Sequence, residues 1–98
     1  MLIASFFGLA LLKLGRPAEA VAPLEQVVRQ HPELPAARYN LACAYARVGR
    51  LSDAWAALEQ AVANRPPLAA LAAHDPALAA LREQADFSNR LQKILAPP

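Results

Sequence analysis

The sequence predicts an all-α fold in which two antiparallel helix-turn-helix units stack into a short right-handed α-solenoid. Alanine and leucine, which favour helices, are the commonest residues, with 24 and 16 copies, whereas β-branched and aromatic residues are few. Shifting the sequence against itself by 34 residues gives 11 identical pairs, and an internal period of this length is typical of stacked helical units. In each unit a glycine separates two helix-prone runs, and a proline ends the second run.

The matching positions divide the chain into three parts within a single domain, residues 1–98. Repeat one covers residues 1–34, repeat two covers residues 35–68, and residues 69–98 do not continue the pattern. A chain of this length buries only about 60–65% of the surface that its unfolded form exposes, which disfavours a deep, self-contained cleft. The identical pairs are Ala10/Ala44, Gly15/Gly49, Arg16/Arg50, Ala20/Ala54, Ala22/Ala56, Leu24/Leu58, Glu25/Glu59, Gln26/Gln60, Val28/Val62, Pro32/Pro66 and Leu34/Leu68.

The first predicted helix covers residues 2–14 and is apolar around its whole circumference. Four residues at helical spacing are expected to face inward: Phe7, Ala10, Leu11 and Leu14. The first helix of an array has a neighbour on one side only, so its remaining apolar surface needs another cover. This cover could be upstream repeats in a longer parent chain, lipid, or a homodimer contact through Leu2, Ile3, Phe6 and Leu9.

The apolar run at the start, Met1–Leu12, has the length of a signal segment. However, no Lys or Arg precedes the run, and no small-x-small cleavage pattern follows it closely. A membrane-spanning helix needs about 20 apolar residues, and this run stops at Lys13. We therefore expect a cytoplasmic protein without a membrane partner. An exported or membrane-tethered array is the alternative if Met1–Leu12 is a signal segment.

The second predicted helix covers residues 17–30. Gly15 suits the left-handed position that follows a helix end, Pro17 suits the first turn of the next helix, and Pro32 closes the unit. Pro23 lies inside the predicted helix and removes one intrahelical hydrogen bond. We therefore expect a kink or a late helix start at Pro23.

Repeat two follows the same order, with predicted helices over residues 35–48 and 52–64. Gly49 separates the two helices, and Ser52 or Asp53 is expected to cap the second one. Residues at helical spacing should again face inward. They are Leu41, Ala44, Tyr45 and Val48 in the first helix, and Ala54, Leu58, Ala61 and Val62 in the second.

Small residues mark the places where the paired helices must approach each other closely. Gly8 and Ala42 occupy equivalent positions on the first helix of each repeat, and Ala20 and Ala54 do so on the second. A larger side chain at such a contact would push the two helices of an antiparallel pair apart.

The spacing of small, aromatic and proline positions over residues 1–68 resembles the tetratricopeptide repeat, whose unit is 34 residues long. The chain departs from the family pattern at Ala4 and Arg38, where a tryptophan is usual. The resemblance implies a stacked helical array and a role in protein–protein interaction. The positions that carry it are Gly8, Leu11, Ala20, Leu24, Pro32, Leu41, Ala42, Tyr45, Ala54, Leu58, Ala61 and Pro66.

Residues 69–98 resemble the segment that often terminates arrays of this family. Asp75-Pro76 predicts a helix start, with helices near residues 76–83 and 86–95. This segment should cover the open apolar edge of repeat two with inward residues Leu78, Leu81, Phe87, Leu91, Ile94 and Leu95. A terminal unit needs a polar outer face, and here that face is expected to consist of Glu83, Asp86, Arg90 and Lys93.

A second stripe on the first helix of each repeat points away from its paired helix. In proteins of this family such a stripe lines a concave groove in which a peptide docks. The resemblance therefore gives a candidate peptide-binding set of Leu9, Leu12, Lys13, Tyr39, Asn40, Cys43 and Arg47. This groove would suit a peptide with apolar side chains and one carboxylate. Family members that clamp chaperone tails need a lysine and an asparagine where this chain has Ser5 and Leu9, so that activity is not expected.

Other function classes find little support in the sequence. The net charge of +2 comes from basic residues that are spread thinly, which argues against a nucleic-acid partner. Cys43 is the single cysteine, and His31 and His74 have no partner at metal-binding or catalytic spacing. We therefore predict a non-enzymatic scaffold with no cofactor or metal that binds a protein or peptide partner. The alternative is a structural self-association module. The Ala- and Arg-rich, Lys-poor composition is typical of a GC-rich bacterial genome.

Overall fold

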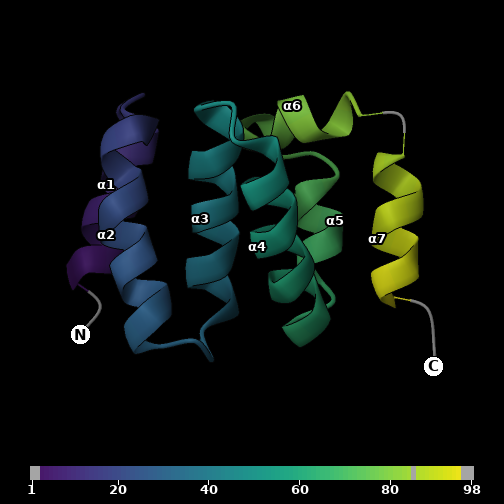
Figure 1. The fold of residues 1–98 in the computed structure, drawn as a ribbon, viewed down its shortest axis with the longest axis horizontal. Coiled ribbons are helices and arrows are strands. Elements are labelled where there is room, and N and C mark those ends of the chain that lie inside the picture. The colour runs from purple at the N-terminus through teal and green to yellow at the C-terminus, as the bar shows by residue number, and fades with distance from the viewer. Residues whose placement is uncertain (1–2, 85, 96–98) are drawn as a thin grey trace.

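The computed structural model describes residues 3–84 and 86–95, and within them the side chains of residues 7–84 and 86–94 (Figure 1). The described residues are helical with no strand, which confirms the predicted all-α fold. The elements are α1 (Ile3–Lys13), α2 (Pro17–Gln30), α3 (Pro35–Arg47), α4 (Leu51–Asn64), α5 (Leu68–Ala72), the 3₁₀ turn η1 (Pro76–Leu78), α6 (Ala79–Arg82) and α7 (Phe87–Leu95).

The four long helices form two hairpins that stand side by side (Figure 1). α1 pairs with α2, α3 pairs with α4, and α3 also packs against α2, so the two hairpins share a continuous core. The C-terminal elements close the other side of repeat two, with η1 and α6 against α3, and α6 and α7 against α4. The bounds of the first four helices agree with the predicted ranges to within a residue.

Each long hairpin turns at a glycine with a left-handed backbone. Gly15 has φ +75° and Gly49 has φ +87°. The two turns share one hydrogen-bond pattern: the Arg16 amide donates to the Leu11 carbonyl at 2.8 Å, and the Arg50 amide donates to the Tyr45 carbonyl at 2.9 Å. These bonds satisfy carbonyl groups at the helix ends, as expected for a glycine in the position after a helix.

The turn at Gly49 gives a first testable prediction. Replacing Gly49 by alanine should lower the free energy of unfolding by roughly 1–2 kcal/mol, because a Cβ disfavours the left-handed conformation. Gly49→Asn should lower the free energy of unfolding by less, since asparagine adopts the left-handed conformation more readily than alanine. Urea unfolding of the three proteins measures the difference. Equal stability of the alanine variant and the parent would show that the turn does not need the left-handed residue.

The predicted close contacts between paired helices are confirmed. A Cβ built on Gly8 would stand 2.6 Å from Cγ of Leu24 on α2, so the two helices meet with no room for a side chain. The equivalent small residues Ala20, Ala42 and Ala54 are completely buried. The stripe of small residues therefore sets how closely the helices pack.

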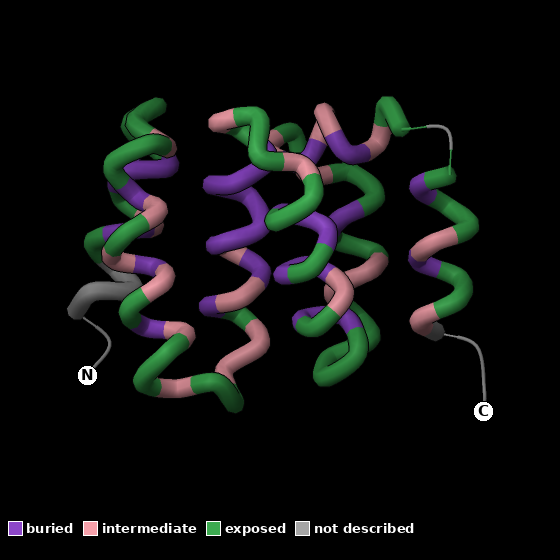
Figure 2. Tube along the Cα trace, viewed as in Figure 1, coloured by how far each residue is buried: buried purple, intermediate pink, exposed green. Residues whose placement is uncertain are grey.

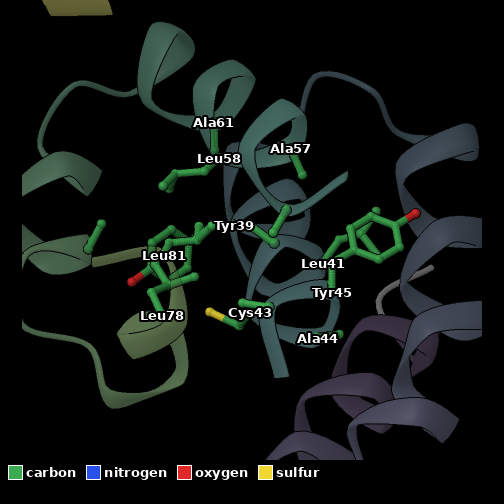
Figure 3. Close-up of a cluster of buried hydrophobic side chains, with 14 of the residues drawn as sticks. Tyr39, Leu41, Cys43, Ala44, Tyr45, Ala57, Leu58, Ala61, Leu78 and Leu81 are labelled. Carbon is green, nitrogen blue, oxygen red and sulfur yellow. The ribbon is translucent and has the colours of Figure 1, made fainter. Parts of the chain in front are cut away.

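Many of the buried residues lie on α3 and α4 (Figure 2). Leu58 of α4 and Leu81 of the C-terminal segment belong to one hydrophobic cluster, and Leu41 lies beside Tyr45 on the side of α3 toward the first hairpin (Figure 3). The inward stripe predicted for α4, which consists of Ala54, Leu58, Ala61 and Val62, is completely buried. On α3, Leu41, Ala44 and Tyr45 are buried and Val48 is half-buried. The inward positions predicted for repeat two are therefore confirmed.

The inward face predicted for α1 is wrong at three of its four positions. Leu11 is buried, but Phe7 is 56% exposed, Leu14 is 70% exposed and Ala10 is also exposed. The equivalent residues of α3 are covered because the α1–α2 hairpin packs against them. No described residue gives the outer side of α1 the same cover.

The predicted cap of α4 is also wrong, and one of the two outcomes expected at Pro23 is ruled out. α4 begins at Leu51 with Arg50 in the capping position, and no side chain of the described chain caps it, so neither Ser52 nor Asp53 is the cap. The turn at Gly49 fixes this earlier start. The Asp53 carboxylate instead accepts a hydrogen bond from Arg50 Nε at 2.9 Å. α2 begins at Pro17, which rules out the late start at Pro23, whereas the kink at Pro23 stays a prediction.

The C-terminal segment follows the prediction in outline. Leu78 and Leu81 are completely buried, and Phe87 and Leu91 are also buried. Ile94 is half-buried, and the side chain of Leu95 lies outside the described residues. The short helix α5 was not predicted, because its sequence LAALA is too short to reveal a period.

The polar outer face of the segment needs one correction. Glu83, Asp86 and Lys93 are exposed as predicted, but Arg90 faces α4. Its guanidinium carbon lies 4.2 Å from the centre of the Trp55 ring, and its Nη2 lies 3.5 Å from a Glu59 oxygen. An arginine can stack on an aromatic face while its tip pairs with a carboxylate, so Arg90 helps to hold α7 against α4.

Candidate peptide-binding groove

A cavity of about 390 Å³ lies between α1, α3 and the α5–η1 region, and it is called the groove below. The groove has one wall from α1 (Leu9, Leu12, Lys13), a floor from α3 (Ala36, Tyr39, Asn40, Cys43, Arg47) and a second wall from the C-terminal segment (Leu68, Leu71, Asp75, Ala77). The structure thus brings together all seven residues of the candidate peptide-binding set.

The repeat explains why residues so far apart in sequence line one cavity. Leu9 and Cys43 are equivalent residues of the two repeats, and so are Lys13 and Arg47. Since α1 and α3 are equivalent helices of neighbouring hairpins, they present these residues along the same side. Spacings of three and four residues keep the members of each set on one helix face.

The wall from the C-terminal segment was missed by the sequence analysis. Leu71 is 52% exposed and extends the apolar surface of the groove opposite α1. Asp75 was recognised only as a helix start, a role that is confirmed because its Oδ1 accepts the Ala77 amide at 2.9 Å. Its place in the groove could not be predicted, because residues after 68 leave the repeat that located the other lining residues.

Tyr39 and Asp75 connect the floor of the groove to this wall. The buried Tyr39 hydroxyl donates a hydrogen bond to Oδ2 of Asp75 at 2.7 Å. Burial, and then the hydrogen bond to Asp75, raise the pKa of Tyr39 well above its usual value. The tyrosine therefore stays a neutral donor and holds the Asp75 carboxylate at the edge of the cavity.

Cys43 lies on the groove floor, with its Sγ 4.0 Å from Oδ2 of Asp75. Burial, and then the nearby Asp75 carboxylate, raise the pKa of the Cys43 thiol to about 12 against the opposing effect of Arg47. Because the folded pKa is raised, the thiol keeps its proton until the pH approaches 12. A protonated, buried thiol is a poor nucleophile.

This environment predicts low reactivity of Cys43. At pH 8 an aromatic disulfide reagent should modify the folded protein far more slowly than the denatured protein, in which the thiol has an ordinary pKa. The absorbance of the released thiolate measures both rates. Equal rates in buffer and in denaturant would contradict the burial of Cys43.

The charged residues of the groove are Lys13, Arg47 and Asp75. Lys13 and Arg47 are exposed at the C-terminal ends of α1 and α3, and Arg47 Nη1 donates a long hydrogen bond to the Leu12 carbonyl at 3.4 Å. Both cations stand where helix dipoles favour positive charge. The groove therefore has an apolar interior with two cations toward one end and one carboxylate on the opposite wall.

The protonation of the groove side chains limits the chemistry that they can take part in. Tyr39 and Cys43 both have raised pKa values and stay protonated at neutral pH. Across residues 3–84 and 86–95, no group of His, Cys, Asp and Glu side chains could hold a metal ion. What the lining offers a ligand is apolar surface, hydrogen-bonding groups and charge.

The residues predicted for self-association are only partly described. Leu2 lies outside the described residues, and so do the side chains of Ile3 and Phe6. Leu9 lines the groove and is half-buried. Among the described side chains of the first helix and its end, the exposed large apolar residues are Phe7 and Leu14.

The match to a family model decides the family. The model of the tetratricopeptide repeat matches residues 7–69, which is nearly two thirds of the chain. The chain belongs to the tetratricopeptide repeat family. Tetratricopeptide repeats generally mediate protein–protein interactions. Comparisons with curated proteins and with solved structures found no match.

The family match also separates two parts of the groove. The wall from α1 and the floor from α3 lie in the matched residues of the tetratricopeptide repeats, whereas Leu71, Asp75 and Ala77 lie after them.

None of the helices in the described part of the chain is long and apolar enough to cross a membrane.

Proposed function

We propose that this tetratricopeptide repeat protein is a non-catalytic scaffold that binds a peptide segment of a partner protein in the groove. The observation that carries the proposal is the convergence of α1, α3 and the C-terminal segment on one cavity. Pockets that bind ligands are concave and mostly apolar, with a few polar groups that orient the ligand. The groove has this composition.

The lining indicates the chemistry of the bound segment. Leu9, Leu12 and Leu71 offer apolar surface for one or two apolar side chains. Asn40, which is half-buried on the floor, offers both a donor and an acceptor for the peptide backbone. A carboxylate of the ligand would be attracted to the cations of Lys13 and Arg47.

Arg47 provides the test of this proposal. A phage-displayed library of random peptides would be selected on the immobilised protein, and the selected peptides would then be titrated against Arg47→Glu. We expect the variant to bind acidic peptides about tenfold or more weakly, because charge reversal turns attraction into repulsion. Circular dichroism should show unchanged helix content.

Arg29→Glu is the matched control, since Arg29 is exposed on α2 and is not among the groove residues. It makes the same charge change and should leave the affinity unaltered. Selection of no peptide above background would contradict the proposed function. Equal affinity of Arg47→Glu and the parent would remove Arg47 from the site.

A second candidate function is self-association through α1. The exposure of Phe7 and Leu14 favours it, because a continuous apolar stripe on a helix usually has a cover. Sedimentation at micromolar concentration separates the two candidates. A mass twice that of the chain, reduced to the single mass by Leu14→Glu, supports self-association. The mass of a single chain rules it out as a stable state.

A further inference from the structure

Asp75 is the acidic residue among those that line the groove. Among the described residues, no Lys, Arg or His forms an ion pair with it. Arg82 approaches from the same segment, but its Nη1 donates to the main-chain carbonyls of Ala72 and Asp75 and not to the carboxylate. In the described part of the chain, a half-buried carboxylate therefore faces the groove with no salt bridge, and the Nη1 of the approaching Arg82 is taken up by main-chain carbonyls.

The hydrogen bonds of Asp75 hold its carboxylate in place but do not use all of its acceptor sites. Oδ1 accepts the Ala77 amide, and Oδ2 accepts the Tyr39 hydroxyl and, at 4.0 Å, the Cys43 thiol. A carboxylate has about four acceptor sites, so Oδ1 can take another donor. Removing a carboxylate from water is costly unless a cation or further donors replace the lost hydration. A ligand that fills the apolar groove would therefore gain by placing a cation beside Asp75.

From this charge arrangement we propose that the groove prefers a peptide with a lysine or arginine, because this basic residue pairs with the Asp75 carboxylate. The inference rests on the proposed function and adds a cationic residue to the ligand chemistry stated there. It assigns the choice of ligand partly to the C-terminal segment, which lies outside the matched repeats.

The register of α3 gives the spacing of the peptide's charges. Asp75 contacts Tyr39 and lies near Cys43, which precede Arg47 by about two turns and one turn of α3. At 1.5 Å per helical residue this is a separation of roughly 6–12 Å along the groove. An extended peptide advances about 3.3 Å per residue, so its basic and acidic residues should be about two to four positions apart. The apolar side chain between them would lie against Leu9 and Leu71.

The test measures how Asp75 and the peptide's cation depend on each other. The peptides selected on the parent protein should contain Lys or Arg about two to four positions from Asp or Glu. Asp75→Asn keeps the shape of the side chain and removes its charge. It should weaken binding of such a peptide about tenfold, while a peptide whose basic residue is replaced by norleucine should bind both proteins equally.

A control variant separates the charge of Asp75 from the general effect of removing a carboxylate. Asp53→Asn neutralises an exposed carboxylate on α4 that pairs with Arg50, away from the groove, and should change nothing.

The outcomes are distinguishable from those that test the proposed function. If peptides are selected but Asp75→Asn keeps the full preference for the basic residue, this inference is overturned and the proposed function stands. If no peptide is selected, both fail. If Asp75→Asn does not fold, two measurements on the parent protein test the inference. The norleucine peptide must then bind about tenfold more weakly than the basic one. The ¹³C carboxyl resonance of Asp75 must shift when the basic peptide binds and must not shift when the norleucine peptide binds.

Discussion

Leu58→Ala is expected to lower the free energy of unfolding by about 2–5 kcal/mol, which is a large part of the roughly 5–15 kcal/mol available to a domain of this size. Leu58 is completely buried on α4, where α3, α4 and the C-terminal elements meet. Truncation removes apolar surface from the core and leaves a cavity that the neighbouring helices cannot fill. Chemical denaturation monitored by circular dichroism measures the loss.

Leu14→Ala is the matched control, because it makes the same chemical change at a side chain that is 70% exposed. Its effect should stay within about 0.5 kcal/mol, as is usual for surface substitutions. Similar losses at Leu58 and Leu14 would contradict the core described here, since burial is the main difference between the two sites.

Gly8→Val is the second substitution with a large expected effect. A Cβ at this position would stand 2.6 Å from Cγ and 2.8 Å from Cδ2 of Leu24, and Leu24 is itself completely buried. Because Leu24 is completely buried, it can move away from a new side chain only by displacing its own neighbours or by separating α1 and α2. Overpacking of this kind typically costs about 1–3 kcal/mol, and occasionally more. The free energy of unfolding in urea gives the value.

The control for Gly8 lies on the same helix. Ala10→Val also introduces a β-branched residue into α1, but Ala10 is exposed, so only a small loss of helix propensity is expected. If the Gly8 and Ala10 variants are equally stable, then α1 and α2 do not approach each other as closely as the structure requires.

The repeat is the reason that much of this fold can be predicted from the sequence. Equivalent residues 34 positions apart have equivalent neighbours, so Gly15 and Gly49 adopt the same turn and Ala20 and Ala54 are both buried. The same argument located the residues of α1 and α3 that line the groove. Each of these predictions depends only on local helix geometry and on the neighbouring repeat.

The predictions fail where the repeat ends, because an equivalent residue then has no equivalent neighbour. Phe7 and Leu14 are exposed although Leu41 is buried, since no hairpin in the described residues covers α1 as the α1–α2 hairpin covers α3. At the other end, Asp75 reaches the groove through a hydrogen bond to Tyr39, 36 residues earlier. No periodic pattern in the sequence specifies such a contact.

The capping of α4 shows that prediction from the sequence also has a limit within a single helix. Ser52 and Asp53 have suitable side chains for a cap, and sequence alone cannot distinguish a cap from the first turn of the helix. The left-handed turn at Gly49 decides the question by starting α4 at Leu51, so Asp53 lies inside the first turn. There its negative charge is still favourable, because the helix dipole is positive at this end.

The central claim is that two equivalent hairpins pair internally and pack side by side. Nuclear Overhauser spectroscopy of the isotope-labelled protein tests both contacts in one experiment. The structure predicts cross-peaks between the Gly8 Hα protons and the Leu24 methyl groups, within the first hairpin. It also predicts cross-peaks between the Tyr45 ring and the Glu25 side chain, which share a hydrogen bond between the two hairpins. A folded, helical protein that lacks both sets of cross-peaks would contradict the claim.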